Sequence, residues 1–370
     1  MKGQWIGKYE GTNSGNITLE LDERPNNFVG WAYLYDSATG YPSSAARIET
    51  IDKSDHQSFN VKIKPLNPFN GNLLEWRDVS SSFPGFNFPN SADVSFKFSE
   101  NTLDLEWNTD ICTSGKAALS KSKASSPSEL IAKKLSTWDE FKKEVQNLPL
   151  RDHIFRGQKK SSEWRLRTAF HRSGRADLRA FIENDIRELH ASTINLTSYK
   201  FALENPLDLA SFYALLQHHG YPTPLQDWTY SPYIAAYFAY AGISKNIEKQ
   251  TGHCRIFTFA SRQFNGEIQR KNVIAGIPPH FSLLEPLAIE NQRMFNQQGF
   301  FAVTNVDDVE SHIKHLEELG KNTYLRAFDL PTNLRAEIMQ DLERMGITAA
   351  TMFPGIDGVC KYQRERLFDI

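Results

Sequence analysis

Two imidazoles, an amide and a carboxylate lie close together in one stretch of the chain, at Gln217, His218, His219 and Asp227. An imidazole titrates near neutral pH and can act as a general base, whereas a carboxylate can stabilise a cationic centre. Because buried polar groups need partners, the stretch forms either a polar network that only fixes a turn or a functional site. Adjacent residues of a helix point about 100° apart, so we expect only one of the two histidines to face such a site.

The residues around this group predict a helix, a sharp turn, a short strand and a second helix over residues 205–241. Asn205 and Pro206 form an N-cap followed by a first-turn proline, and Gly220 suits a helix C-cap with positive φ. Two prolines after Gly220 favour extended backbone, which predicts a strand over 225–228. Ser231 then caps a helix that is apolar nearly all round and is therefore expected to be buried.

A second candidate lies earlier, where residues 152–158 (DHIFRGQ) predict a strand. Arg156 and Phe155 are expected on opposite faces of that strand. Gly157 has no side chain and would let a ligand or another backbone approach closely. A lone arginine would favour an internal salt bridge, for example with Asp227, but an excess of basic residues between 151 and 179 favours a site.

Four sequence motifs of the chain also resemble those of a known family. The sequences IFRGQ at 154–158, QHHGYPTPLQDWTYSPYIAAYFA at 217–239, NQRMFNQQGFF at 291–301 and FPGIDG at 353–358 resemble the FRG domain, a bacterial family named after its Phe-Arg-Gly word. The words occur in the expected order and cover about two-thirds of the chain. Members of this family often stand beside extra domains in bacterial genomes, and a toxin or antiviral-defence effector would fit such an arrangement.

The same words distantly resemble ADP-ribosyltransferases, which transfer ADP-ribose from NAD to a macromolecular acceptor. Arg156, the Thr229 to Ser231 word and Gln297 follow the order of that family's arginine, serine and glutamate motifs. The resemblance implies that Arg156 pairs with the pyrophosphate, that the Gly157 backbone holds the nicotinamide amide and that an aromatic ring stacks on the base. The residues expected to bind NAD are Phe155, Gly157, Gln158, Gln217, Thr223, Trp228, Thr229, Tyr230, Ser231, Tyr233 and Arg293.

The chain departs from this pattern at Gln297 and Gln298, where a glutamate is usual. Glutamine can hydrogen-bond a ribose hydroxyl, but it supplies no charge to a cationic transition state. Asp227 is the first candidate for the missing carboxylate and Glu290 is the second. The catalytic set is therefore predicted as Arg156, His218 or His219, Asp227 and Gln297, with NAD as substrate and no metal.

Two other functions fit the same residues. Basic residues around Arg156, together with Trp228, Tyr230 and Tyr233, would suit a non-catalytic nucleotide or nucleic-acid binding module. Metal-dependent hydrolysis would use the two adjacent histidines with Asp227 and His171, but their spacing matches no recognised metal motif.

The first third of the chain predicts a β-rich recognition domain over residues 1–119. Nine segments alternate apolar and polar residues between Gly-, Pro- and Asn-rich turns, the sixth of them at 73–79, so we expect an antiparallel barrel or sandwich. The spacing of Trp5, Gly7, Tyr9 and Gly11 suggests a lipocalin-like barrel. This domain carries no catalytic constellation, and we expect it to bind a partner or a ligand.

A polar linker is predicted at 120–134, followed by an α+β domain at 135–370 with an ADP-ribosyltransferase-like core. Its predicted elements include a helix capped by Ser136, strands at 255–259, 299–303 and 324–328, and helices at 306–319 and 333–345. The composition, 40% hydrophobic and 23% charged, is that of a soluble globular protein. Three widely spaced cysteines give no case for a disulfide framework, and a net charge of −2 gives no global case for binding nucleic acid. Without an apolar run of membrane-spanning length or a signal core, the chain is expected to be cytoplasmic.

Overall fold

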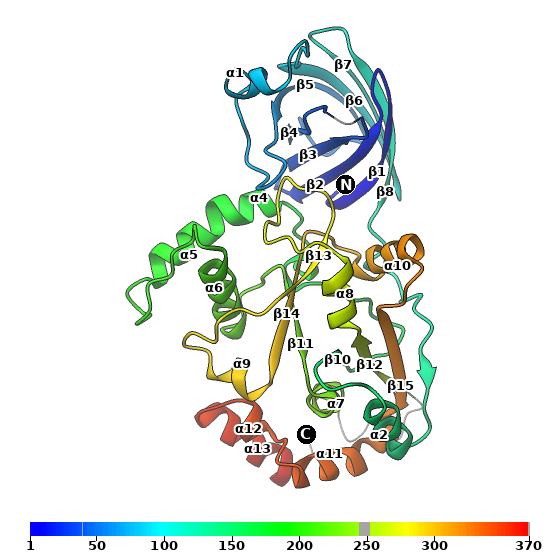
Figure 1. The fold of residues 1–370 in the computed structure, drawn as a ribbon, viewed down its shortest axis with the longest axis vertical. Coiled ribbons are helices and arrows are strands. Elements are labelled where there is room, and N and C mark those ends of the chain that lie inside the picture. The colour runs from blue at the N-terminus through cyan, green and yellow to red at the C-terminus, as the bar shows by residue number, and fades with distance from the viewer. Residues whose placement is uncertain (39, 244–251, 369–370) are drawn as a thin grey trace.

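The computed structural model describes residues 1–38, 40–243 and 252–368, and its N-terminal part is a closed antiparallel barrel (Figure 1). Each strand pairs with the next, and β1 closes the barrel by pairing with β8. The prediction of an antiparallel barrel is thus confirmed. The strands are β1 (Gly3–Gly11), β2 (Gly15–Glu23), β3 (Phe28–Asp36), β4 (Ser44–Glu49), β5 (His56–Pro65), β6 (Ser91–Ser99), β7 (Thr102–Thr109) and β8 (Ser114–Lys121).

One of the nine predicted strands, at 73–79, is wrong. That segment ends in the short helix α1 (Trp76–Val79), within the long connection between β5 and β6. The Trp76 ring stacks on Phe88 at 5.1 Å and on Phe83 at 5.9 Å. These contacts within the connection take the place of pairing in the barrel wall, which alternation along the sequence does not distinguish from a strand.

The rest of the chain is an α+β region built on a seven-stranded sheet of order β13-β14-β11-β10-β12-β15-β9. Every neighbouring pair is antiparallel except β15 with β9. The strands are β9 (Lys133–Lys134), β10 (Ile154–Gln158), β11 (Leu225–Thr229), β12 (His253–Phe259), β13 (Phe281–Leu284), β14 (Gly299–Thr304) and β15 (Leu325–Pro331).

Helices cover both faces of this sheet and its lower end (Figure 1). They are α2 (Trp138–Gln146), α3 (Ala169–Arg172), α4 (Leu178–Ala180), α5 (Ile186–Thr193), α6 (Pro206–His218), α7 (Pro232–Tyr240), α8 (Ser261–Glu267), α9 (Gln292–Asn296), α10 (Val309–Gly320), α11 (Arg335–Arg344), α12 (Ala349–Met352) and α13 (Ile356–Leu367). Among the residues described, no helix is long and apolar enough to cross a membrane.

The predicted helix, turn, strand and helix over 205–241 are confirmed as α6, β11 and α7. The Asn205 side chain accepts hydrogen bonds from two amides of the first turn of α6, and Gly220 has φ of 87°. Ser231 caps α7 by accepting from the Ile234 amide, and most of α7 is buried. Elsewhere the cap of α2 is Thr137 rather than the predicted Ser136, because it is the Thr137 side chain that accepts from the Glu140 amide.

Of the two roles considered for Gly157, close approach of a ligand or of another backbone, the structure shows the second. A Cβ atom at this position would lie 1.8 Å from the carbonyl oxygen of Ala235 and 2.7 Å from the amide nitrogen of Ala239. Both atoms belong to the backbone of α7, which cannot move away without separating the helix from β10. The glycine is therefore required for the close packing of α7 on the sheet, and no ligand can take that space.

The barrel is joined to the α+β region by a buried polar junction. Asp22 of β2 accepts from the Ala176 amide at 2.6 Å and the Asp177 amide at 3.1 Å, and it pairs with Arg175 at 2.9 Å. Glu20 lies nearby and is 2% exposed. Burial, and secondarily the charge of Asp22, raises the pKa of Asp177 to about 6. One strand of the barrel, β2, thus holds the segment that connects α3 with α4.

We predict that Gly157→Ala destabilises the protein by roughly 1–3 kcal/mol, as overpacking does in a well-packed interior. Unfolding by urea, followed by circular dichroism, should show a lower midpoint. Gly266→Ala is the matched control because no atom lies within 4 Å of its added Cβ. Equal midpoints for the two variants would contradict the assigned role of Gly157.

A second prediction concerns the pH dependence of stability. The pKa of Asp177 is about 6 in the folded chain against 3.8 ordinarily, so between these values the folded chain binds the extra proton. Its contribution to stability therefore falls as pH rises from about 4 through about 6. Asp177→Asn keeps a helix-capping side chain and should raise stability at neutral pH by up to about 3 kcal/mol, with little change near pH 4. Urea midpoints at the two pH values, with the exposed Asp104→Asn as control, measure this effect; a pH-independent difference would count against it.

Candidate functional site

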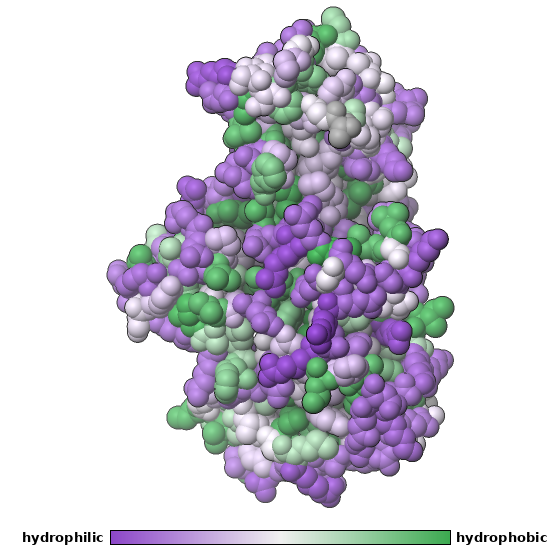
Figure 2. Space-filling view, in the orientation of Figure 1, coloured by the Kyte–Doolittle hydropathy of each residue, from purple (hydrophilic) through white to green (hydrophobic). Residues whose placement is uncertain are grey.

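The cavity of the α+β region lies where its two central strands separate. β10 pairs with β11 through one residue pair, Phe155 with Thr229, although each strand pairs over five positions with its other neighbour. Beyond that pair the strands diverge and leave a cavity of about 680 Å³. In Figure 2, hydrophilic residues gather over this part of the face, where β10, β11 and α7 lie in Figure 1.

Arg156 bridges the gap between the two strands. Its Nη1 donates a hydrogen bond to the backbone carbonyl of Asp227, a group that a paired strand would otherwise satisfy. The alternative considered from the sequence, a salt bridge with the Asp227 carboxylate, is therefore not what the structure has. The carboxylate instead accepts a hydrogen bond from the side-chain amide of Gln217 at the end of α6, and Gln217 in turn accepts from Thr223.

Positive charge surrounds the Asp227 carboxylate. Burial lowers the pKa of Arg156, of Arg172 and of Arg293, and in each case the charge of Asp227 acts in the opposite direction. Within the described ranges, none of these three arginines forms an ion pair, and neither does Lys159 at the same cavity. These three arginines consequently share the Asp227 carboxylate.

Two further arginines of the wall are neutralised. Arg165 pairs with Asp308 at 2.8 Å and with Glu129 at 3.0 Å, and Arg167 pairs with the buried Asp307. Both aspartates immediately precede α10. These arginines therefore fix the wall of the cavity, whereas Arg156, Arg172 and Arg293, which no described residue pairs, remain available to an anion.

The structure distinguishes the two adjacent histidines. His218 lines the cavity and its Nδ1 has no hydrogen-bond partner, whereas His219 is exposed and lies outside the lining. Burial, and then the charges of Arg293 and His219, lower the pKa of His218. The imidazole is therefore neutral at neutral pH, which is the form a general base requires.

Gln297 and Arg293 enter from α9 and the turn after it. The Gln297 amide donates to the Met352 carbonyl at 3.0 Å, and its backbone carbonyl accepts from the Thr229 hydroxyl at 2.8 Å. The Arg293 guanidinium lies 4.4 Å from the ring centroid of Phe353. Phe353 of the FPGIDG motif thus helps to position Arg293, and Met352, just before the motif, helps to position Gln297.

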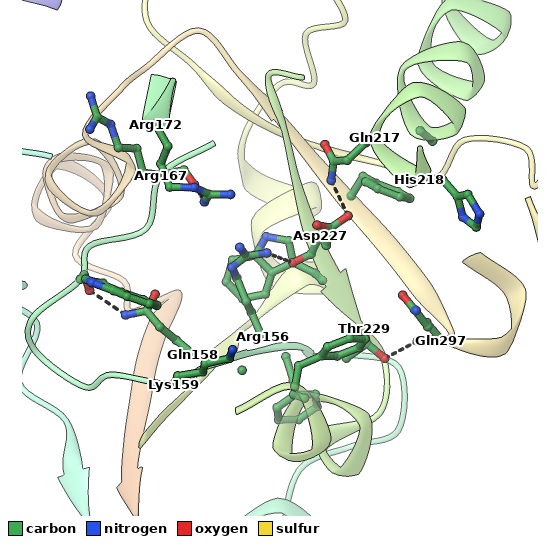
Figure 3. Close-up of a pocket in the computed structure, with 18 of the residues that line it drawn as sticks. Arg156, Gln158, Lys159, Arg167, Arg172, Gln217, His218, Asp227, Thr229 and Gln297 are labelled. Carbon is green, nitrogen blue, oxygen red and sulfur yellow. Dashed lines mark hydrogen bonds between the residues drawn. The ribbon is translucent and has the colours of Figure 1, made fainter. Parts of the chain in front are cut away.

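The structure brings most of the predicted site residues to this cavity. Those that line it are Phe155, Arg156, Gly157, Gln158, Gln217, His218, Asp227, Trp228, Thr229, Arg293 and Gln297. In Figure 3, Gln158, Lys159, Arg167 and Arg172 lie on one side of Arg156, with Asp227, Gln217, His218 and Gln297 towards the other. The cavity therefore has a strongly basic end and an end with amide, imidazole and carboxylate groups.

Other predicted residues lie outside the lining for local reasons. Thr223 is fully buried, and Ser231 is used as a helix cap. Tyr230 donates to Glu285, and Tyr233 packs edge-on against Trp138 at 6.0 Å. Glu290, the second candidate carboxylate, accepts from the amides of residues 198 and 199 instead of facing the cavity.

Several lining residues were not assigned to the site from the sequence. They are Lys159, Glu163, Trp164, Arg165, Arg167, Arg172, Phe238, Asn291 and Met294, with Ala124 and Ser125 from the segment after the barrel. The excess of basic residues between 151 and 179 was the available signal for the cations. Across the described ranges, no group of three or more His, Cys, Asp or Glu side chains is arranged to hold a metal ion.

Comparison with family models supports two of the four motifs, those at 154–158 and 217–239. No curated protein matches the chain. Two solved structures match about a third of it: a redesigned beta barrel (9% identity, 33% of this chain and 90% of that one, TM-score 0.23) and Rv2717c from M. tuberculosis (9%, 33% and 92%, 0.19). These scores support no conclusion. A family model matches residues 151–248, which include β10, α6, β11 and α7, and the chain therefore carries an FRG domain at these positions.

Proposed function

We propose that the cavity binds NAD and transfers its ADP-ribose to a macromolecular acceptor. The observation that carries this proposal is the group of three arginines around the Asp227 carboxylate, Arg156, Arg172 and Arg293, which form no ion pair with any described residue. Such a group favours a ligand with more than one negative charge, as the two phosphates of NAD provide. The volume of about 680 Å³ falls in the range of small-molecule sites.

The division of charge along the cavity also suits the two ends of NAD. The phosphates would lie at the basic end, near Arg156, Lys159 and Arg172, where guanidinium groups can bind phosphate oxygens in pairs. The nicotinamide ring is cationic and would lie towards Asp227. This orientation places the ribose carbon that is attacked close to the carboxylate.

In the reaction, the bond between C1′ of the ribose and the ring nitrogen breaks, and its electron pair neutralises the nicotinamide. The sugar becomes oxocarbenium-like, and the charge of Asp227 stabilises it electrostatically. The acceptor then forms a bond to C1′ and loses a proton to the neutral imidazole of His218. Asp227 thereby takes the place of the glutamate that is missing at Gln297.

Gln297 has a supporting task in this scheme. Its amide nitrogen is already used by the Met352 carbonyl, so its side-chain oxygen is the free group. That oxygen can accept a hydrogen bond from a ribose hydroxyl and fix the orientation of the sugar. A toxin or defence role would follow from transfer to a protein or nucleic acid, with the barrel recognising the partner.

A second candidate function is nucleotide binding without turnover. The observation in its favour is that the only carboxylate among the predicted catalytic residues is already hydrogen-bonded by Gln217. In that case the cavity would retain NAD intact, and the cations would serve recognition alone.

We predict that Arg156→Ala weakens NAD binding by about tenfold to a hundredfold, since hydrogen bonds to charged groups contribute about 1.5–3 kcal/mol. Asp227→Asn should leave the dissociation constant within about threefold and reduce nicotinamide release by about 10²–10³. Calorimetry measures binding and chromatography measures release. Arg77→Ala, at an exposed arginine of the barrel, is the control.

The outcomes separate the alternatives. Binding without release in the wild-type protein would leave the non-catalytic function standing and remove the transferase. Absence of NAD binding would remove both nicotinamide chemistry and NAD recognition. Salt-sensitive binding of oligonucleotides in place of NAD would assign the basic end to nucleic acid.

A further inference from the structure

We propose that Trp164 is the stacking platform for the second base of the dinucleotide, the adenine, so that the cavity selects a dinucleotide over a nicotinamide mononucleotide. This inference rests on the proposed function and adds a specificity-determining residue to it. The aromatic residues that the sequence suggested for stacking are Trp228, Tyr230 and Tyr233. In the structure Trp228 is buried, Tyr230 donates a hydrogen bond to Glu285 and Tyr233 packs against Trp138.

Trp164 differs from the other rings at the cavity in its exposure. It is 48% exposed, whereas Phe155 and Trp228 are 4% and 3% exposed and belong to the packed interior. An indole that lines a cavity and keeps half of its surface in water has an uncovered apolar face. A planar base is the ligand group that covers such a face most completely.

The loop that carries Trp164 is held in place before any ligand binds. The Gln158 side chain donates to the Trp164 carbonyl at 2.8 Å and to the Lys160 carbonyl at 3.0 Å. The next residue, Arg165, is anchored by Asp308 through two hydrogen bonds of 3.0 and 2.8 Å. Stacking therefore requires little additional ordering of the loop, which favours affinity.

The charges near Trp164 fit a base joined to a phosphate. Lys159 follows Gln158 directly, and both lie at the basic end of the cavity with Arg167 and Arg172 (Figure 3). The Lys160 Nζ lies 5.9 Å from the Trp164 ring centroid, over one face of the indole. A base on the opposite face would have its phosphate towards the cations of the basic end and away from Asp227.

The orientation follows from the two ends together. With adenine on Trp164 and the phosphates on the cations, the nicotinamide ribose extends towards Asp227. Nicotinamide mononucleotide has the nicotinamide ribose and one phosphate but no adenine, so it would reach Asp227 and the cations without reaching Trp164. Removal of the indole should consequently affect the dinucleotide alone.

The test compares NAD with nicotinamide mononucleotide by calorimetry on the full chain. Trp164→Ala should weaken NAD binding by about 5- to 150-fold, the equivalent of one base stack, and change mononucleotide binding by less than about twofold. Trp164→Phe should retain most of the NAD affinity and Trp164→Leu should not. Trp76→Ala removes a tryptophan of the barrel and is the control.

The results distinguish this inference from the proposed function. The proposed function is overturned if the wild-type protein does not bind NAD, or if its NAD binding does not depend on Arg156. Arg156-dependent NAD binding that Trp164→Ala leaves unchanged, or weakens equally for the mononucleotide, overturns the stacking role alone. Equal affinity of Trp164→Leu and Trp164→Phe for NAD would also overturn it.

Discussion

The separation of β10 from β11 is the constraint on which the site depends. Two central strands that touch through one residue pair leave unpaired backbone groups in the middle of a sheet, and buried groups of this kind need partners. Arg156 supplies one partner by donating to the Asp227 carbonyl. On the other side, Gly157 lets α7 pack against β10 without a side chain between them. The same two residues thus open the cavity and keep the sheet intact around it.

The arginines of the cavity fall into two groups, which differ in the carboxylates that compensate their charge. The arginines that fix the wall find aspartates just before α10, far away in sequence, while Arg156, Arg172 and Arg293 share the carboxylate of Asp227. Like charges held together raise the free energy of the empty site, and an anionic ligand lowers it. Part of the affinity for an anion is therefore set by residues that need not touch it.

Local signals predicted the fold better than they predicted the site. Asn205, Gly220 and Ser231 act within their own turns, so the helix, strand and helix around them could be predicted from neighbours alone. The reason for Gly157 depends on a helix nearly eighty residues later, and sequence spacing does not reveal that contact. Likewise, the choice of His218 over His219 depends on how α6 is rotated against the sheet. The exposure of Trp164 depends on which distant segments pack near it, and no local sequence pattern encodes that packing.

The buried junction makes the barrel and the α+β region depend on each other's side chains. Gln4 of β1 exchanges hydrogen bonds with Asn305 and Asp307, and Asp307 holds Arg167 in the cavity wall. Asp22 of β2 holds the segment after α3 in the same way. A different module fused at this position would leave those groups without partners. The barrel and the FRG-containing region are therefore expected to be inherited together, and recombination that exchanges one must carry the junction residues of the other.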